Sequence, residues 1–252
     1  MKQETSEEKI ILTKEEYKSL LDRTKRQPLI YDSFDKWDNL ESLEVFSDKQ
    51  ILVCFDTLEN CAHYPHHIQG EWTKRRDISI LSLLTFCGLR PGEACSLRFD
   101  DYVSAEDCLL IRPENNKQKR GRKVPLPKQA KKYISNYLKM PKYIWANSEF
   151  LFPSFENKQK PLSSRTWKYI MREKILKPSG LWVAPTGNKN NRVPKFRSYS
   201  FRHSFAQKIL SNSAQDLNAV ANLLGHTNTR TTKRYLHNNK EYQDYLREVM
   251  ER

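Results

Sequence analysis

The sequence predicts a mainly helical α+β protein that contains one small antiparallel β-sheet. Apolar residues recur at helical spacing along most of the chain, in segments bounded by capping residues, Gly or Pro. Two short β-like segments, 108–112 and 123–126, flank a basic stretch that is typical of a hairpin tip. Hydrophobic residues make up 38% of the 252 residues, which is enough for a substantial core.

The first predicted helix follows Thr13, which has the character of an N-cap. Apolar residues at helical spacing continue from it to Leu21, and the helix is expected to end before Pro28.

Residues 28–72 follow a less regular pattern and are predicted to be an insertion. One role for this insertion would be contact with DNA or with another subunit. A short helix is expected around 37–46 and another apolar segment at 51–58. Pro65 and Gly70 are expected to break the pattern before the next helix.

The segment 77–86 predicts a buried helix, with Gly88 as its left-handed stop. Pro91 then stands at the first position of a new helix and Glu93 at the third, where both are favoured.

The predicted hairpin has its tip in 113–122, which is strongly basic and contains Gly121. A loop rich in Pro and Gly is expected at 177–198. The remaining helices are predicted at 128–138, from Ser163 or Ser164 to about 176, and at 200–211, 214–224 and 229–237, followed by an amphipathic tail at 240–252.

The charge of the chain is high and unevenly distributed. The net charge is +14, but residues 1–60 hold 9 basic against 14 acidic residues, and the remainder hold 35 against 16. A basic body of this size indicates a polyanion partner, most often nucleic acid, although a merely soluble basic surface has the same composition.

Membrane and secreted proteins are excluded by composition. The most apolar stretch, 78–89, is interrupted by Ser and Thr and falls short of the roughly 20 residues that a membrane span needs. The first nine residues are mostly charged and polar, unlike a secretory signal. We therefore expect a cytoplasmic protein.

Five cysteines without a C-x-x-C pair fit a reducing compartment rather than a disulfide framework. Cys61, His63, His66 and His67 are metal-ligand types in one short segment. No second ligand pair accompanies them, so a polar loop is favoured over a zinc site, and no metal or cofactor is predicted.

Three separated motifs carry residues suited to phosphate chemistry: 87–93 (CGLRPGE), 202–206 (RHSFA) and 223–237, which contains LGH and, nine residues after His226, Tyr235. Each has a structural alternative on its own. Arg90 could simply pair with Glu93 after a helix end, and the second motif could be a solvated helix face. The third could be a plain helix-turn-helix.

Together and in this order, the three motifs resemble the G-L-R-x-x-E, R-H-x-F-A and L-G-H-x(8)-Y boxes of the tyrosine recombinases, also called the phage integrase family. The resemblance covers roughly 10–25 and 74–240. It implies the catalytic-domain fold of that family and an enzyme that cuts and rejoins DNA in site-specific integration, excision or transposition of a mobile genetic element.

The resemblance implies six site residues: Arg90, Lys117, Tyr199, Arg202, His226 and Tyr235. Both arginines and His226 would bind the scissile phosphate, and Tyr235 would attack phosphorus to form a covalent phosphotyrosine. Lys117 on the hairpin would be the general acid, with Lys119 as the near alternative. Because the phosphotyrosine keeps the energy of the phosphodiester, no cofactor is needed.

Two departures from the family pattern accompany the match. Tyr199 stands where the family usually has His, and a neutral Tyr with a pKa near 10 can donate a hydrogen bond but is a poor general base at pH 7. His203 would point about 100° away around the helix and is not a substitute. The whole chain, 1–252, is expected to be a catalytic domain, with the family's N-terminal DNA-clamping domain absent or truncated.

The implied partners are double-stranded DNA and further copies of the chain, in a tetrameric synapse on DNA. The tail at 240–252 could dock on a neighbouring subunit or on its own domain. Two other functions fit the same motifs: a non-catalytic DNA-binding protein on an integrase fold, and a topoisomerase-like strand transferase.

Overall fold

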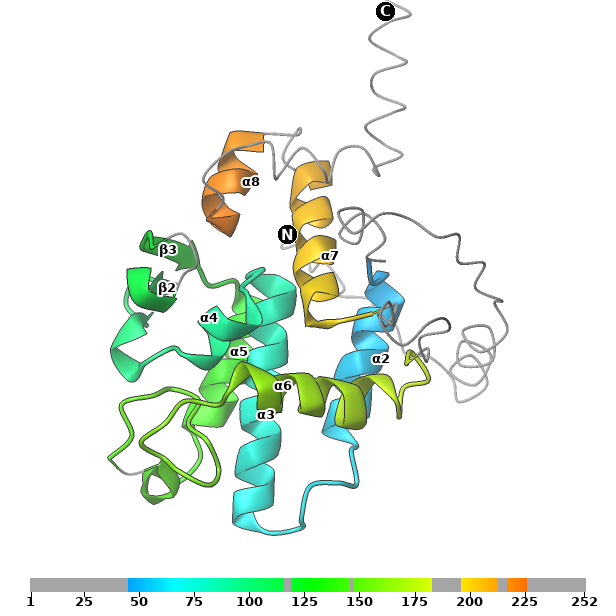
Figure 1. Cartoon of the computed structure of the whole chain (residues 1–252), viewed down its shortest axis with the longest axis vertical. Coiled ribbons are helices and arrows are strands. Elements are labelled where there is room, and N and C mark those ends of the chain that lie inside the picture. Colours follow the sequence, from blue (N-terminus) through cyan, green and yellow to red (C-terminus); the bar gives the residue numbers. More distant parts are fainter. Residues whose placement is uncertain (1–44, 116–118, 146, 183–195, 213–216, 226–252) are drawn as a thin grey trace, which may run out of the picture.

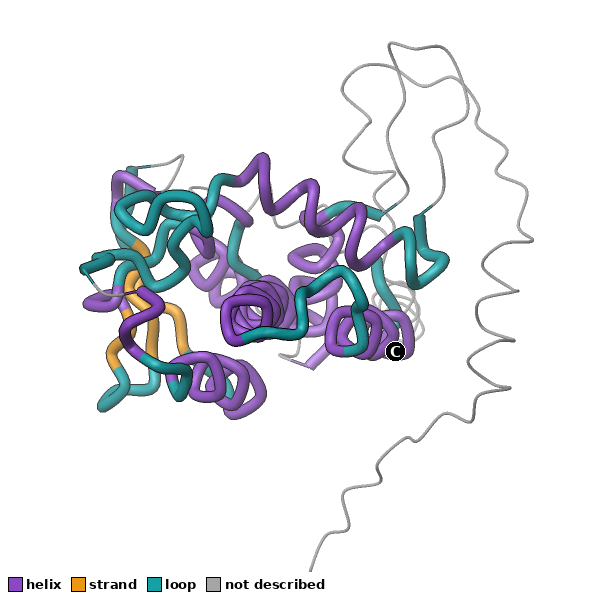
Figure 2. The backbone as a smooth tube through the Cα atoms, turned by 90° about the horizontal axis from the view of Figure 1, so that it is seen from below, coloured by secondary structure: helices purple, strands orange, loops and turns teal. Residues whose placement is uncertain are grey.

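The structure is a computed structural model that describes residues 45–115, 119–145, 147–182, 196–212 and 217–225. Within these ranges the chain is mainly helical with one three-stranded antiparallel sheet, which confirms the predicted fold class. Figure 1 shows the helices forming most of the molecule, with the strands on one side of it, and Figure 2 shows the same arrangement from below. The α-helices are α2 (Asp48–Glu59), α3 (Ile68–Phe86), α4 (Pro91–Cys95), α5 (Lys128–Leu138), α6 (Ser164–Ile170), α7 (Ser198–Asn212) and α8 (Leu217–Leu224).

Helix α3 is the centre of the fold and packs against α2, α4, α5 and α7. Its side chains are buried around most of its circumference, including the fully buried Trp72, Leu81 and Leu84. The helix begins nine residues before the predicted start, at Ile68. Gly70 lies inside its first turn and does not break it, contrary to expectation. A Cβ at Gly70 would lie 1.9 Å from the carbonyl oxygen of Pro65, so the glycine permits this close approach.

The described part of the predicted insertion packs into the same core. The apolar segment at 51–58 lies within helix α2, which begins at a capping box between Ser47 and Gln50. Phe46 precedes the helix, so the expected helix around 37–46 does not include its last two residues. Phe46 instead stacks on Phe196 and Phe201, with ring centroids 4.4 and 4.3 Å away. The rest of the segment lies outside the described residues, and the insertion stays a prediction.

The sheet has the order β1 (Tyr102–Val103), β2 (Cys108–Ile111), β3 (Arg122–Pro125). Strands β2 and β3 form the predicted hairpin, in a register that pairs Ile111 with Arg122. Strand β1 was not predicted, because two residues are too few to show a period. Short 3₁₀ turns, η2 (Phe99–Asp101), η3 (Pro113–Asn115) and η4 (Lys142–Trp145), connect these elements to their neighbours.

The later elements also follow the sequence pattern. Ser163 caps α6 by accepting a hydrogen bond from the Thr166 amide at 3.0 Å, and the helix continues as a π-helical segment, η5 (Met171–Leu176). Gly88 follows α3 with φ of +62°, as predicted, and Gly225 likewise follows α8 with φ of +66°. The predicted helices before residue 45 and after residue 225, including the 240–252 tail, lie outside the described residues.

No helix in the described ranges has the length and apolar character to cross a membrane.

Candidate active site

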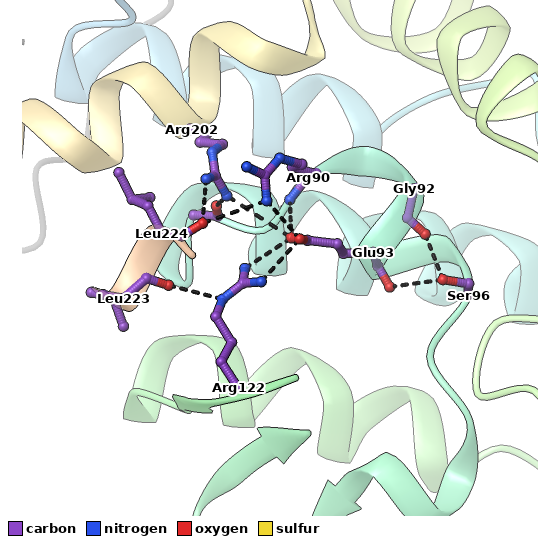
Figure 3. Close-up of polar contacts among 9 residues, drawn as sticks. Arg90, Gly92, Glu93, Ser96, Arg122, Arg202, Leu223 and Leu224 are labelled. Carbon is purple, nitrogen blue, oxygen red and sulfur yellow. Dashed lines mark hydrogen bonds and ion pairs between the residues drawn. The ribbon is translucent and has the colours of Figure 1, made fainter. Parts of the chain in front are cut away.

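The candidate site lies where the start of α4, the first residue of β3, one face of α7 and the end of α8 meet. Figure 3 shows the guanidinium groups of Arg90, Arg122 and Arg202 converging on the carboxylate of Glu93. Arg90 is the N-cap residue of α4 and Glu93 is the third residue of that helix. The fold thus brings together the first two predicted motifs, which are separated by more than a hundred residues, and the end of α8 that begins the third.

Glu93 is the hub of this cluster, with a side chain that is only 1% exposed. Its Oε1 accepts hydrogen bonds from Arg90 Nη1 at 2.8 Å and Arg122 Nη1 at 3.0 Å. Its Oε2 accepts from the Arg90 amide and from Arg122 Nη2, both at 2.9 Å. Burial alone would raise the pKa of Glu93. The hydrogen bonds and charge of Arg122, the Arg90 amide and the charge of Arg202 outweigh burial and hold that pKa below its usual value.

Arg202 is buried, with 2% of its surface exposed, so it does not lie on a solvated helix face. Its Nη1 donates to the Gly88 carbonyl at 2.6 Å and its Nη2 to the Leu224 carbonyl at 2.5 Å. Arg90 Nη1 approaches the same Leu224 carbonyl at 3.5 Å. Both predicted arginines therefore meet at the end of α8, one residue before Gly225.

The four charged side chains of the cluster carry a net charge of +2, from three guanidinium groups and one ionised carboxylate. A cavity of about 680 Å³ opens beside Arg90 and Glu93, and Glu93 alone is acidic among its described lining residues. The other charged side chains that line it are basic: Lys168, Arg172 and Arg197. A partly buried excess of positive charge of this kind favours an anion, and forked guanidinium groups suit phosphate oxygens.

Tyr199 lines the same cavity from the first turn of α7 and is 43% exposed. It lies three residues before Arg202, about one helical turn away. The predicted residues Tyr199 and Arg90 thus line the same cavity.

His203 is partly buried beside the cluster. Burial, followed by the charges of Arg202 and Arg197, lowers the pKa of His203 to about 4. The imidazole is therefore neutral at pH 7.

The low pKa of His203 predicts a pH dependence of stability. The unfolded chain, with a His pKa of 6.5, binds more protons than the native state between pH 6.5 and about 4, so the free energy of unfolding falls as pH drops through that window. Between pH 7 and 4.5 we expect His203→Gln to lose about 2 kcal/mol less stability than the wild type in urea titrations. His66→Gln, which removes an exposed histidine outside the cluster, is the control. If the free energy of unfolding depended on pH in the same way for the wild type and His203→Gln, the lowered pKa of His203 would be contradicted.

Three of the predicted site residues, Lys117, His226 and Tyr235, lie outside the described residues. Lys119, the alternative general acid, is described and has a left-handed backbone with φ of +49° at the hairpin.

Arg122 was missed as a site residue, since the sequence placed it at the end of the basic hairpin tip. The structure places it in β3 with a side chain that is 10% exposed and bound to Glu93. One signal in the sequence could have identified it. Arg122 stands immediately before the predicted β-like segment, so its backbone position is fixed by the strand and not by the loop at the hairpin tip.

The histidine-rich segment forms polar contacts of its own. Cys61 Sγ lies 3.5 Å from His63 Nδ1, and the His67 side chain caps α3 by accepting from the Gly70 amide. Over the described part of the chain, no three His, Cys, Asp or Glu side chains are grouped so as to hold a metal ion.

The sequence of this chain matches a family model and several curated proteins. The model of the phage integrase family matches residues 55–242. The tyrosine recombinase XerC of Pediococcus pentosaceus is 32% identical over 174 residues, covering 67% of this chain and 52% of that protein. The tyrosine recombinase XerA of Pyrococcus horikoshii is 32% identical over 177 residues, covering 70% and 54%. This chain thus spans about half the length of these curated relatives.

Solved structures share the fold. A XerA recombinase crystal structure has a TM-score of 0.60 at 22% identity, over 80% of this chain and 63% of that one. The Tn1549 transposon integrase in complex with circular intermediate DNA has a TM-score of 0.58 at 18% identity, over 89% and 67%. With the family model covering most of the sequence and the arginines of two motifs meeting at the end of α8, this chain belongs to the phage integrase family of tyrosine recombinases.

Proposed function

We propose that the chain is the catalytic part of a site-specific DNA recombinase that cuts and rejoins strands through a covalent phosphotyrosine at Tyr235. The observation that carries this proposal is the meeting of Arg90 and Arg202 around one carbonyl, in a cluster with a net charge of +2 beside a basic cavity. Permanently charged donors held in place before the reaction are the electrostatic arrangement that a phosphoryl transition state requires.

In the proposed cleavage step, the Tyr235 oxygen bonds to phosphorus and releases its proton to solvent. The bond from phosphorus to the 5′-oxygen breaks, and Lys117 protonates that oxygen. Arg90, Arg202 and His226 stabilise the charge that develops on the non-bridging oxygens, and Tyr199 adds a hydrogen bond. Rejoining reverses the step when a 5′-hydroxyl attacks the phosphotyrosine, so no metal or nucleotide is consumed.

The proposed substrate is duplex DNA, acted on by a tetramer of the chain in integration, excision or transposition. Several solved relatives of the same fold are described as complexes with DNA, among them the Tn1549 transposon integrase with circular intermediate DNA. In this chain, the basic residues around the cavity offer a surface for the phosphate backbone. A tetramer whose 240–252 tails dock on neighbours would couple the position of Tyr235 to assembly.

A test of the DNA surface uses Lys168, an exposed α6 residue at the cavity. Lys168→Gln should weaken binding to an arbitrary duplex of about 30 base pairs and reduce the slope of log affinity against log salt by about 0.9. Fluorescence anisotropy at several salt concentrations measures both quantities. Lys132→Gln on α5, which removes the same charge away from the cavity, should leave the slope unchanged. Equal slopes for wild type and Lys168→Gln would place the duplex elsewhere.

The covalent step is tested directly by capture of protein-linked DNA. The protein is incubated with sheared genomic DNA of the encoding organism, denatured in detergent, and the attached DNA is sequenced, with Tyr235→Phe as control. Adducts at a recurrent sequence that disappear in the control would support the proposal and identify the target. Adducts that persist in the control would overturn Tyr235 as nucleophile.

A further inference from the structure

Arg122 makes contacts that differ from those of the other two arginines in the cluster. Its Nη1 and Nη2 bind the two oxygens of Glu93 as a fork, at 3.0 and 2.9 Å. Its Nε donates to the Leu223 carbonyl at 3.1 Å. All three guanidinium nitrogens thus donate within the protein, and Figure 3 shows the side chain spanning from β3 to α4 and α8.

The fork on Glu93 reaches Arg90 indirectly. Each oxygen of Glu93 that accepts from Arg122 also accepts from Arg90, one from its guanidinium and the other from its amide. A carboxylate gripped at both oxygens cannot rotate freely, so the orientation of Glu93 also sets that of the Arg90 guanidinium. In this geometry Arg122 helps to orient Arg90, which is proposed to bind the phosphate, but Arg122 does not itself bind the phosphate.

Arg122 also contacts the C-terminus of α8. Arg122 binds the Leu223 carbonyl and its guanidinium lies against Gly225, where a Cβ would come within 2.9 Å of Nη1 and 3.1 Å of Cδ. The chain leaves α8 at this glycine, immediately before His226. The absence of a side chain at Gly225 is therefore what lets Arg122 close over the helix end.

We propose that Arg122 is a positioning residue for strand cleavage. It orients Arg90 through Glu93 and holds the end of α8 at Leu223. This inference rests on the proposed recombinase function. It assigns Arg122 an effect on the rate of cleavage rather than on affinity for DNA.

The test compares Arg122→Gln with Lys123→Gln, which removes the same charge from the next residue of β3. The Lys123 side chain is 63% exposed and pairs with Glu106 at 2.7 Å, away from the cluster. Three quantities are measured: hydrogen exchange of amides in 217–225 without DNA, affinity for a duplex carrying the recovered target sequence, and the rate of detergent-resistant adduct formation on it.

For Arg122→Gln we expect exchange in 217–225 to accelerate about tenfold and adduct formation to slow about thirtyfold, with DNA affinity within about twofold of the wild type. Lys123→Gln should leave exchange and adduct rate unchanged. Arg122→Lys keeps the charge but not the fork, so its exchange and adduct rates should lie between those of the other two variants. It replaces Arg122→Gln in the test if that variant does not fold. A wild-type adduct rate in Arg122→Gln, or a loss of affinity in place of rate, would overturn the proposal.

Coupling through Glu93 is tested by the double variant. If Arg122 acts through Glu93, Glu93→Gln and Arg122→Gln together should slow adduct formation little more than either alone. If the fold-reductions in adduct rate of the two single variants multiply in the double variant, Arg122 does not act through Glu93. Should the wild type form no adduct at all, the recombinase function fails, while unchanged exchange in Arg122→Gln would separately overturn the positioning of α8.

Discussion

Replacing Arg202 by lysine is expected to slow strand cleavage by about a hundred- to a thousandfold while leaving DNA affinity nearly unchanged. The guanidinium binds the carbonyls of Gly88 and Leu224 with two different nitrogens, and only a forked group reaches both. A lysine keeps the charge, but its single ammonium cannot hold both carbonyls and still face a phosphate oxygen. The loss should therefore fall on the transition state.

The measurement is the single-turnover rate of adduct formation, with affinity determined separately. Arg98→Lys is the matched control, because Arg98 is a partly exposed arginine that pairs with Glu149 outside the cluster. It should cleave at the wild-type rate. A lysine at position 202 that cleaved as fast as arginine would show that the fork is unnecessary and would remove Arg202 from the proposed phosphate site.

Replacing Gly88 by alanine is expected to have the largest effect on stability, about 3 kcal/mol of the free energy of unfolding. Two costs combine at this position. The φ of +62° is strained for any residue with a Cβ, and that Cβ would lie 2.3 Å from the Phe205 ring. Phe205 is buried on α7, the helix that also holds Arg202. The clash would therefore also push Arg202 away from the Gly88 carbonyl that it binds.

Urea or thermal unfolding measures this loss, and Gly92→Ala is the control. A Cβ at Gly92 would meet only Ser164 Oγ at 3.5 Å, an ordinary contact. Gly92→Ala should therefore change stability by less than about 1 kcal/mol. Adding Phe205→Leu to Gly88→Ala should recover the part of the loss that comes from the clash. No recovery would mean that backbone strain alone accounts for the effect.

Much of the fold was predictable because its signals are local. Helix α5 matches its predicted range, since Ala130, Ile134 and Tyr137 repeat on one face and are buried there. The cap at Ser163 and the left-handed stops at Gly88 and Gly225 also depend on only a few neighbouring residues. The start of α3 was predicted too late because Gly70 was expected to break the pattern and the residues after it, 71–76, are mostly polar.

The amino-acid sequence by itself determined the fold class, the order of the helices and the hairpin, and the two arginine motifs that resemble the tyrosine recombinases. These features depend on periodicity, caps and short motifs, which act over about one or two turns of chain. Only the tertiary structure decided that Arg202 is buried, that Glu93 joins three guanidinium groups, and that Arg122 belongs to the cluster. Apart from the local pair of Arg90 and Glu93, these contacts join residues 22 to 114 positions apart. They therefore require the packing of α4, α7, α8 and β3 against one another.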